Sequence, residues 1–530
     1  MNRKHISRLA VLVGILGAFG CAPEDGREDV GTAAQPLLGS ANAQAFGSGF
    51  GTPDFGDGLT WFGTALASGD LDGDGTTDMV VGIPFAANGG AVDIFWGEKV
   101  SGTTPGGLAN SRVTHLHQPG AGNPEAGDRF GSAVAVGDFN CDGHLDLAVG
   151  APYDDFPTQS GGSIDAAGNV SILYGPDFTS SRWQLFWQGS AGIPGAPEAG
   201  DHFGLVLAVG NFNGDWANGH ACDDLAIGTP DEGVGSASGA GAVTILYGRS
   251  TGLNTAGAPA PQLWHQDVGS VYGLAEEGDH FGQALAAGDF NGDGKDDLAI
   301  GAPFEAYDGV TGEVGIVHVL KGASGGLTDT GNYALRPSDF SGVSLQTAHF
   351  GQALARGDFD GDGKADLAVG APFLSVGGNS SAGAVFVYRQ IGGALSSALR
   401  YDQETSGVPG TAEAGDLCGF TLAAGDFDGN GLDDLASGCP GEGVTASGTD
   451  EGALDVVHFK LVTGALGIVS SQMWHKNASG IPGVCASAEW FSMSLAAGDF
   501  NGDGKADLSA GAYPGSTGNT GTVNVFYGAP

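Results

Sequence analysis

The sequence predicts an all-β protein, a seven-bladed β-propeller whose blades are four-stranded antiparallel sheets. One acidic, glycine-rich motif, "GDLDGDGTTDMVVGIP" at 69–84, recurs in similar form seven times. The first Asp of the motif, or Asn in the third copy, falls at residues 70, 138, 211, 289, 358, 426 and 499. The copies are therefore separated by 68, 73, 78, 69, 68 and 73 residues. A near-constant period of this length is typical of a repeat architecture with one structural unit per copy.

The composition agrees with such a fold and excludes other classes. At 530 residues the chain is too long for a single small core, so several domains or one repeat array are expected. There are 61 acidic and 19 basic residues, and a net charge of −42 argues against nucleic-acid binding, which needs Lys and Arg. With 41% apolar residues, 28 Phe among them, the chain can bury a core and is not disordered.

Residues 1–20 predict a secretory signal peptide. The basic "MNRKHISR" is followed by the short apolar "LAVLVGILGAFG". The segment resembles a bacterial lipoprotein signal, which implies lipid attachment at Cys21, although Ala18 and Phe19 depart from that pattern. The alternative is an ordinary cleaved signal with an incidental cysteine. Residues 21–40 are expected to form a polar tether, and residues 41–530 the propeller.

Each repeat is expected to supply four short strands. The first is rich in small residues and begins with Phe-Gly, as in "FGTALASGD" at 62. The acidic loop, a segment such as "DLAVGAP", an alternating strand such as "GAVTILYG" (241–248) and a segment such as "PQLWHQD" (261–267) follow. Strands rich in Ala and Gly suit the innermost position of a propeller, where the blades converge.

The Phe-Gly start and the Gly-Ala-Pro end, which flank the aspartate-rich loop, resemble the FG-GAP repeat. That repeat builds the seven-bladed propeller head of integrin α chains and occurs in many bacterial surface proteins. The resemblance covers about residues 42–530 and implies the same fold. Blades 6 and 7 depart from it, with "LCGF" (417–420) and "WFSM" (490–493) in place of Phe-Gly.

The repeat count also predicts how the ring closes. The last repeat reaches only its third strand, "VNVFYGAP", while "ANAQAFGSGF" (41–50) precedes the first Phe-Gly. We therefore expect residues 41–50 to complete blade 7 as its fourth strand, which would cover an exposed sheet edge.

The acidic loops predict calcium binding. Oxygen ligands at positions 1, 3, 5, 7 and 9 of a tight turn can converge on one hard cation. In the first loop these are the carboxylates of Asp70, Asp72, Asp74 and Asp78 and the backbone oxygen of Thr76. An EF-hand would need Glu at position 12 and flanking helices, but position 12 is Val81 in a β-like segment, and dockerin modules are excluded for the same lack of helices.

The same register assigns ligands in five further loops. The side-chain ligands are Asp138, Asn140, Asp142 and Asp146; Asp289, Asn291, Asp293 and Asp297; Asp358, Asp360, Asp362 and Asp366; Asp426, Asp428, Asn430 and Asp434; Asp499, Asn501, Asp503 and Asp507. The backbone ligands are those of His144, Lys295, Lys364, Leu432 and Lys505.

The third loop interrupts this pattern. It contains Asn211, Asn213 and Asp215 and then an insertion before Asp224, so it is expected to be a weak or empty site. About six calcium ions with a structural role are therefore expected, and the alternative is a set of Asx-rich turns without metal.

Several other residues invite interpretation. Cys141 and Cys222 belong to the same face of adjacent blades and are expected to pair, and one pair is expected among Cys418, Cys439 and Cys485. The alternative is that all these thiols are free. His202, His280 and His349 each precede a Phe-Gly and are interpreted as polar strand-start residues rather than a weak metal or ligand site. The motif "EAGD" occurs at 125–128, 198–201 and 413–416, with "EEGD" at 276–279. Its carboxylates are interpreted as acceptors of backbone hydrogen bonds between blades rather than as a partner site.

The function that these features favour is a calcium-stabilised, non-catalytic scaffold for adhesion or for binding a protein or glycan. The alternatives are a propeller-based polysaccharide-acting enzyme or lectin, and a purely structural envelope protein. The sequence contains no HExxH or GxSxG motif and predicts no recurring carboxylate–histidine pair outside the loops. The expected location is the bacterial cell envelope, as an outer-membrane or cell-surface lipoprotein, or outside the cell. The lipid anchor would hold the protein at a membrane.

Overall fold

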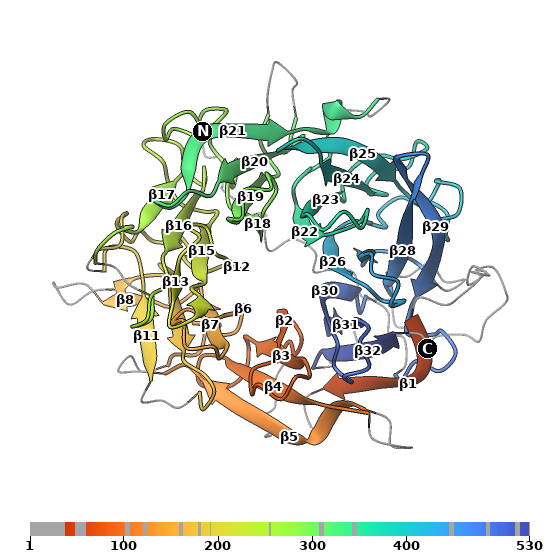
Figure 1. The fold of residues 1–530 in the computed structure, drawn as a ribbon, viewed down its shortest axis with the longest axis horizontal. Helices are drawn as coiled ribbons and strands as arrows, with labels where there is room; N and C mark the ends of the chain where they lie inside the picture. The colour runs from red at the N-terminus through yellow and green to blue at the C-terminus, as the bar shows by residue number, and fades with distance from the viewer. Residues whose placement is uncertain are drawn as a thin grey trace, which may run out of the picture.

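A computed structural model describes residues 38–47, 60–100, 106–119, 124–157, 163–178, 182–190, 192–253, 256–306, 312–341, 347–444, 450–483, 488–514 and 520–528. Seven four-stranded antiparallel sheets are arranged around one axis, with the first strand of each sheet innermost (Figure 1). The predicted fold class is therefore confirmed. The signal peptide, Cys21 and Cys485 lie outside the described residues.

The strands of the first four blades follow one another in chain order. Blade 1 consists of β2 (Leu66–Gly69), β3 (Asp78–Ile83), β4 (Ala91–Glu98) and β5 (Gly107–His117); blade 2 of β6 (Ala133–Gly137), β7 (Asp146–Ala151), β10 (Asn169–Leu173) and β11 (Trp183–Phe186); blade 3 of β12 (Val206–Gly210), β15 (Asp224–Thr229), β16 (Ala242–Leu246) and β17 (Gln262–Trp264); blade 4 of β18 (Ala284–Gly288), β19 (Asp297–Ala302), β20 (Ile316–Lys321) and β21 (Thr328–Leu335).

The remaining blades repeat this order until the ring closes. Blade 5 consists of β22 (Ala353–Gly357), β23 (Asp366–Ala371), β24 (Ala384–Gln390) and β25 (Leu395–Tyr401); blade 6 of β26 (Thr421–Gly425), β27 (Asp434–Cys439), β28 (Ala453–Val462) and β29 (Ala465–Trp474); blade 7 of β30 (Phe491–Gly498), β31 (Asp507–Ala512), β32 (Thr522–Gly528) and β1 (Leu38–Gly47). Two small hairpins, β8 (Phe156–Pro157) with β9 (Ser163–Ile164) and β13 (Trp216–Ala217) with β14 (His220–Ala221), and one 3-10 turn (Pro337–Asp339) lie outside these sheets.

The ring is closed by β1, which pairs antiparallel with β32 as the outermost strand of blade 7 (Figure 1). This is the place that the sequence predicts for residues 41–50, although the strand runs from Leu38 to Gly47. Phe46 opposes Val523, is fully buried and lies with its ring centroid 4.8 Å from that of Phe95 in blade 1. The closing strand therefore also joins blade 7 to blade 1.

The Phe-Gly and Gly-Ala-Pro segments hold neighbouring blades at very short range. In blade 2, the amide of Gly131 donates to the carbonyl of Gly150 at 3.0 Å. The carbonyl of Gly131 in turn lies against Gly82 of blade 1, where a Cβ would be only 2.0 Å from the oxygen. Gly131 itself has a φ of 94°, which favours glycine. The motif is thus required by the distance between blades.

The hydrophobic core lies between blades rather than within them. The phenylalanines of the Phe-Gly pairs are fully buried, and one core cluster joins Phe290 and Val317 of blade 4 to Leu367 and Phe386 of blade 5. A similar cluster joins blades 1 and 2. Each blade packs one face against the preceding blade and the other face against the following blade. The second strands are therefore buried on both sides, which explains why nearly all of their residues are buried.

Two disulfides are present among the described residues. Cys141 is bonded to Cys222, which confirms the predicted pair between adjacent blades, and Cys418 is bonded to Cys439. Within the described part of the chain, no helix has the length and apolar character needed to cross a membrane.

The closing strand provides a first test of the fold. Replacement of Phe46 by Ala should lower the free energy of unfolding by about 3–5 kcal/mol, because it empties a fully buried site between blades 7 and 1. The measurement is urea unfolding followed by tryptophan fluorescence. Phe85→Ala is the matched control, since that side chain is 37% exposed and its loss should cost much less. Equal losses in the two variants would contradict the role assigned to β1.

Candidate functional site

Each acidic loop connects the first and second strands of its blade. In blade 1 the loop begins directly after β2, at Asp70, and its position 9, Asp78, is the first residue of β3. Position 2 is apolar and fully buried, as Leu71 here and as Phe in the six other blades. This buried side chain fixes the loop to the core, while the polar residues at positions 1, 3 and 5 stay at the surface end of the blade.

The aspartate at position 9 is a buried tie in every blade. In blade 1, Oδ2 of Asp78 accepts the amide of Leu71 at 2.8 Å. Its Oδ1 accepts the amide of Gly97, near the end of the neighbouring strand β4, also at 2.8 Å. Burial is the main cause that raises the pKa of Asp78 to about 7. The same cause raises the pKa values of the equivalent aspartates, to about 8 for Asp146 and Asp507, about 7 for Asp297 and Asp366, and about 6 for Asp434.

Positions 1 and 5 shape the turn by accepting backbone hydrogen bonds. In loop 2, Oδ2 of Asp138 accepts the amide of Gly143 at 2.8 Å, and Oδ1 of Asp142 accepts the amide of His144 at 3.0 Å. Equivalent bonds form in loops 1, 4, 5, 6 and 7. The alternating ligand positions therefore adopt a common turn.

Several loop oxygens are buried without a hydrogen-bond partner, which is the expected state of ligands that bind a cation. They are Oδ1 of Asp70, Oγ1 of Thr76, Oδ1 of Asn140, Oδ1 of Asp215, Oδ2 of Asp297 and Oδ1 of Asn501, so the third loop also has one. Leaving a buried acceptor unsatisfied costs about 1–3 kcal/mol, and a hard cation would remove this cost. These donor sets therefore fit a divalent ion with oxygen ligands.

Carboxylates converge most closely in loops 1 and 5. The ligand oxygens of Asp70, Asp72 and Asp78 lie within 4.8 Å of one another, as do those of Asp358, Asp360 and Asp366. The position 5 carboxylates, Asp74 and Asp362, lie outside these groups. Basic side chains also approach the loops: Arg112 lies 2.7 Å from Asp72, and Arg389 pairs with Asp360.

The third loop keeps the turn bonds of loops 5 and 6 but carries an insertion. The side-chain oxygens of Asn211 and Asn213 both accept the amide of Asp215, at 3.1 and 2.8 Å. The insertion forms the hairpin β13–β14, which the Cys141–Cys222 disulfide joins to loop 2. Asp224 keeps the buried tie, and burial raises its pKa well above the usual value. The hairpin and its disulfide set this loop apart from the other six, while the expectation of a weak or empty ion site in it stays a prediction.

The loops are joined to one another around the ring. At five of the seven interfaces, the amide at position 8 of one loop donates to the position 1 carbonyl of the preceding blade, as Asp223 does to Asp138 and Asp433 to Asp358, both at 3.0 Å. Thr77 donates in the same way to Asp499 of blade 7 at 3.0 Å, across the point of closure. An ion that orders one loop therefore also orders an interface between blades.

The opposite face of the propeller has a feature that sequence reasoning missed. The residue directly before each Phe-Gly, or before its equivalent, has a positive φ although none is glycine. These residues are Trp61, Arg129, His202, His280, His349, Leu417 and Trp490, with φ between 46° and 61°. Such a conformation costs about 1–3 kcal/mol for a bulky side chain, and strained residues of this kind gather at functional sites. In the sequence, the feature that could have indicated these residues is their constant position directly before each Phe-Gly or its equivalent.

Five of these side chains, those of blades 1 to 5, form a continuous row with residues at or just after the Gly-Ala-Pro segments. We call this row the aromatic belt: Tyr513, Trp61, Phe85, Arg129, Tyr153, His202, Asp231, His280, Phe304, His349 and Phe373. The guanidinium of Arg129 lies 3.7 Å from the ring centroid of Tyr153 and 4.8 Å from that of Phe85. Most of these side chains are half-buried, so they present edges to solvent.

The prediction that no recurring carboxylate–histidine pair lies outside the loops is wrong. Nδ1 of His202 lies 2.7 Å and Nδ1 of His280 lies 3.2 Å from the carboxylate of Asp231. His349 lies 3.0 Å from Glu313, and His115 lies 2.7 Å from Asp93. Burial alone would raise the pKa of Asp231, but the hydrogen bonds from the two histidines outweigh it and lower that pKa to about 2.

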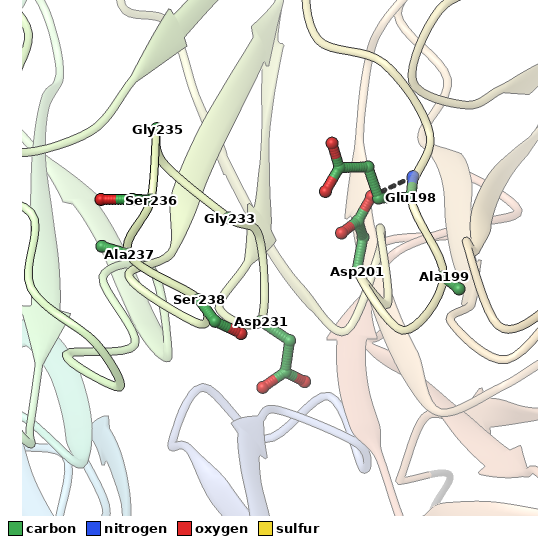
Figure 2. Close-up of a pocket in the computed structure, with 9 residues that line it drawn as sticks. All are labelled: Glu198, Ala199, Asp201, Asp231, Gly233, Gly235, Ser236, Ala237 and Ser238. Atoms are coloured by element: carbon green, nitrogen blue, oxygen red, sulfur yellow. Dashed lines mark hydrogen bonds between the residues drawn. The ribbon is translucent and has the colours of Figure 1, made fainter.

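A polar pocket opens beside Asp231 (Figure 2). Its walls are the turn that contains Glu198 and Asp201 and the loop that contains Asp231, Ser236 and Ser238. Oδ2 of Asp201 accepts the amide of Glu198 at 2.5 Å, and the other "EAGD" turns form the same bond. These motifs therefore accept hydrogen bonds within their own turns, whereas the sequence led us to expect bonds between blades.

A family model for the FG-GAP repeat matches residues 62–95, 130–173, 281–320, 350–388 and 491–526, which lie in blades 1, 2, 4, 5 and 7. Together with the seven sheets, this makes the molecule a seven-bladed β-propeller that carries FG-GAP repeats. Blade 7 is matched although Ser492 replaces the glycine, whereas blade 3, with its insertion, and blade 6, with "LCGF", are not matched.

Among its relatives, integrin alpha-5 of Xenopus laevis is 33% identical over 252 residues, which is 46% of this chain and 20% of that protein. A phosphatidylinositol-glycan-specific phospholipase D of Rattus norvegicus is 32% identical over 203 residues, 37% of this chain and 22% of that protein. Integrin alpha-PS2 of Drosophila melanogaster is 31% identical over 251 residues, 45% and 15% of the two chains. The chain thus spans about a fifth or less of the length of these relatives.

The buried position 9 aspartates predict a pH dependence of the metal-free protein. Their pKa values in the folded state lie near 6–8, above the unfolded value near 3.8, so the folded state binds more protons between these limits. Stability is therefore greatest at the acidic end of this window and is lost as pH rises through the folded pKa values. In EDTA, the melting temperature should fall from pH 5 to pH 8. A constant or rising melting temperature would contradict the burial of these carboxylates.

Proposed function

We propose that this chain is an exported, calcium-stabilised β-propeller that acts as a non-catalytic interaction scaffold and binds a partner through the aromatic belt. The observation that carries the proposal is the row of strained, non-glycine residues on the face opposite the acidic loops. Glycine would adopt these φ values without strain, so the bulky side chains are retained at a cost. Trp, Tyr and Arg, three of the residue types in the belt, are enriched at the energetic centres of protein interfaces.

Calcium is proposed as the ion that keeps this surface in shape. Six loops have the turn and donor pattern of a calcium site, and hydrogen bonds between loops link adjacent blades at five of the seven interfaces. The relatives named as integrins share the propeller repeats with this chain, which supports a binding role. Export and lipid attachment at Cys21 are proposed from the signal-like residues 1–20. The proposed location is the bacterial envelope.

The calcium part of the proposal predicts a stability change. At millimolar calcium and a Kd of about 10⁻⁴–10⁻³ M, each site adds about 0.4–1.4 kcal/mol by mass action, so six sites add several kcal/mol. EDTA should therefore lower the melting temperature substantially in scanning calorimetry, and calcium, but not sodium at equal ionic strength, should restore it.

Two matched variants test the assignment of the loops. The double variant Asp289→Asn and Asp293→Asn should reduce the calcium stoichiometry by one, because it removes two carboxylates from loop 4. Asp215→Asn in loop 3 should leave the stoichiometry unchanged. Equal melting temperatures in EDTA and in calcium would contradict the structural role of the ion.

The binding part of the proposal is tested by capture from envelope extracts of the source cell, in calcium and in EDTA, with a glycan array in parallel. The double variant Trp61→Ala and Arg129→Ala should lose the captured partner, because it removes the two belt side chains that contact Phe85 from either side. Trp216→Ala is the control, since this residue is 70% exposed in the hairpin β13–β14 of the third acidic loop, on the opposite face. Unchanged capture by the belt variant, or turnover of a polysaccharide without a bound partner, would overturn the proposal.

A further inference from the structure

One acidic loop differs from the six others at its buried aspartate. In blades 1 to 5 and 7, Oδ1 of the position 9 aspartate accepts a backbone amide at 2.7–2.9 Å. The donors are Gly97, Gly175, Gly248, Gly322, Gln390 and Gly528. In blade 6, Oδ1 of Asp434 instead lies 2.6 Å from Nδ1 of the His458 side chain.

His458 lies in β28 and points into the acidic loop. Its side chain is 15% exposed, and Nδ1 also lies 3.5 Å from Oδ2 of Asp428. The side-chain amide of Asn430 is 3.4 Å from the same nitrogen. The ligand atoms of Asp428, Asp434 and His458 all lie within 4.8 Å of one another. Among the described residues, no other such group of possible metal ligands contains an imidazole.

The residues that precede the equivalent amides in the six other blades cannot supply a neutral nitrogen ligand. They are Trp96, Tyr174, Tyr247, Lys321, Arg389 and Tyr527. The hydroxyls of Tyr174 and Tyr247 accept amides of the next blade, from Leu253 at 3.0 Å and Leu327 at 2.9 Å. Tyr174 and Tyr247 therefore serve the contact between blades, and Arg389 pairs as a cation with Asp360 of its own loop, whereas His458 brings an imidazole to its loop.

The chemistry of this set differs from that of a calcium site. Calcium takes oxygen ligands, whereas imidazole suits zinc and related transition ions. Position 5 of this loop is Asn430, so the loop also has one carboxylate fewer than loops 1 and 5. Oδ2 of Asp434 accepts the amide of Phe427 at 3.1 Å, so the turn is held while Oδ1 faces the imidazole. Ligands about 2.0 Å from a shared zinc ion stand about 3.3 Å apart, which small side-chain rotations reach from this arrangement.

We propose that the blade 6 loop is a mixed nitrogen–oxygen site that takes a zinc-type ion through His458, Asp434 and Asp428, while the all-oxygen loops take calcium. This inference deepens the proposed function, because it rests on the loops being ion sites. The propeller would then contain two kinds of structural ion, one selected by oxygen ligands and one by the added imidazole.

The test uses the purified mature protein, stripped with EDTA and then held in 1 mM calcium while zinc is added. Isothermal titration should detect one zinc equivalent that calcium does not displace. His458→Tyr, which introduces the residue of blades 2, 3 and 7, should weaken this binding about tenfold or more and leave the calcium stabilisation of the other loops intact. His220→Tyr is the matched control, because His220 is an exposed imidazole in β14, in the insertion of the third acidic loop, and belongs to no assigned ligand set.

A second readout separates ligation from a merely structural ion pair between His458 and Asp434. The X-ray absorption spectrum of the zinc-loaded protein should contain outer-shell scattering from one imidazole, and this signal should be absent in His458→Gln, a variant that keeps a hydrogen-bonding side chain. Equal zinc affinity in wild type and both His458 variants, or no zinc equivalent in excess calcium, would overturn the inference. Calcium stabilisation could persist in either case, so this failure is distinguishable from failure of the proposed function.

Discussion

The structure depends on the buried aspartate that opens the second strand of each blade. It lies where the acidic loop, the second strand and the end of the third strand meet, and at most 1% of it is exposed in any blade. A carboxylate has several acceptor sites, so one side chain can hold the loop backbone and the neighbouring strand together and still offer lone pairs to an ion. Without such partners, a charged group in this position would be strongly unfavourable.

From this tie the order of the loops extends around the ring. The hydrogen bonds from position 8 to position 1 of the preceding blade connect loops at five of the seven interfaces, and blade 7 meets blade 1 through Thr77. Because the hydrophobic core also lies between blades, each interface combines apolar burial with these polar bonds at one end. An ion bound in a loop thus acts on the interfaces on which the whole ring depends.

The two faces of the propeller are built by opposite means. The acidic face repeats one turn with nearly the same residues, as expected where a common geometry is required. The opposite face repeats one backbone conformation with different side chains, including Trp61, Arg129 and His202. A constant backbone that presents variable side chains is typical of a surface whose chemistry is adapted to a partner while the scaffold is kept.

The sequence by itself determined the number of blades, the position of the acidic loops, the insertion in the third loop and the segment that closes the ring. The blades and loops follow from glycine and aspartate that recur at constant spacing within each repeat, and the closing segment follows from the strand count, because the last repeat lacks a fourth strand. Only the tertiary structure decided that the belt residues touch one another, that His202 and His280 share Asp231, and that His458 turns into its loop. These contacts join residues that are distant along the chain, and residue types that vary from blade to blade leave no repeated pattern to read. Their positions follow from the closure of the ring, which brings the same structural position of successive blades to a common face.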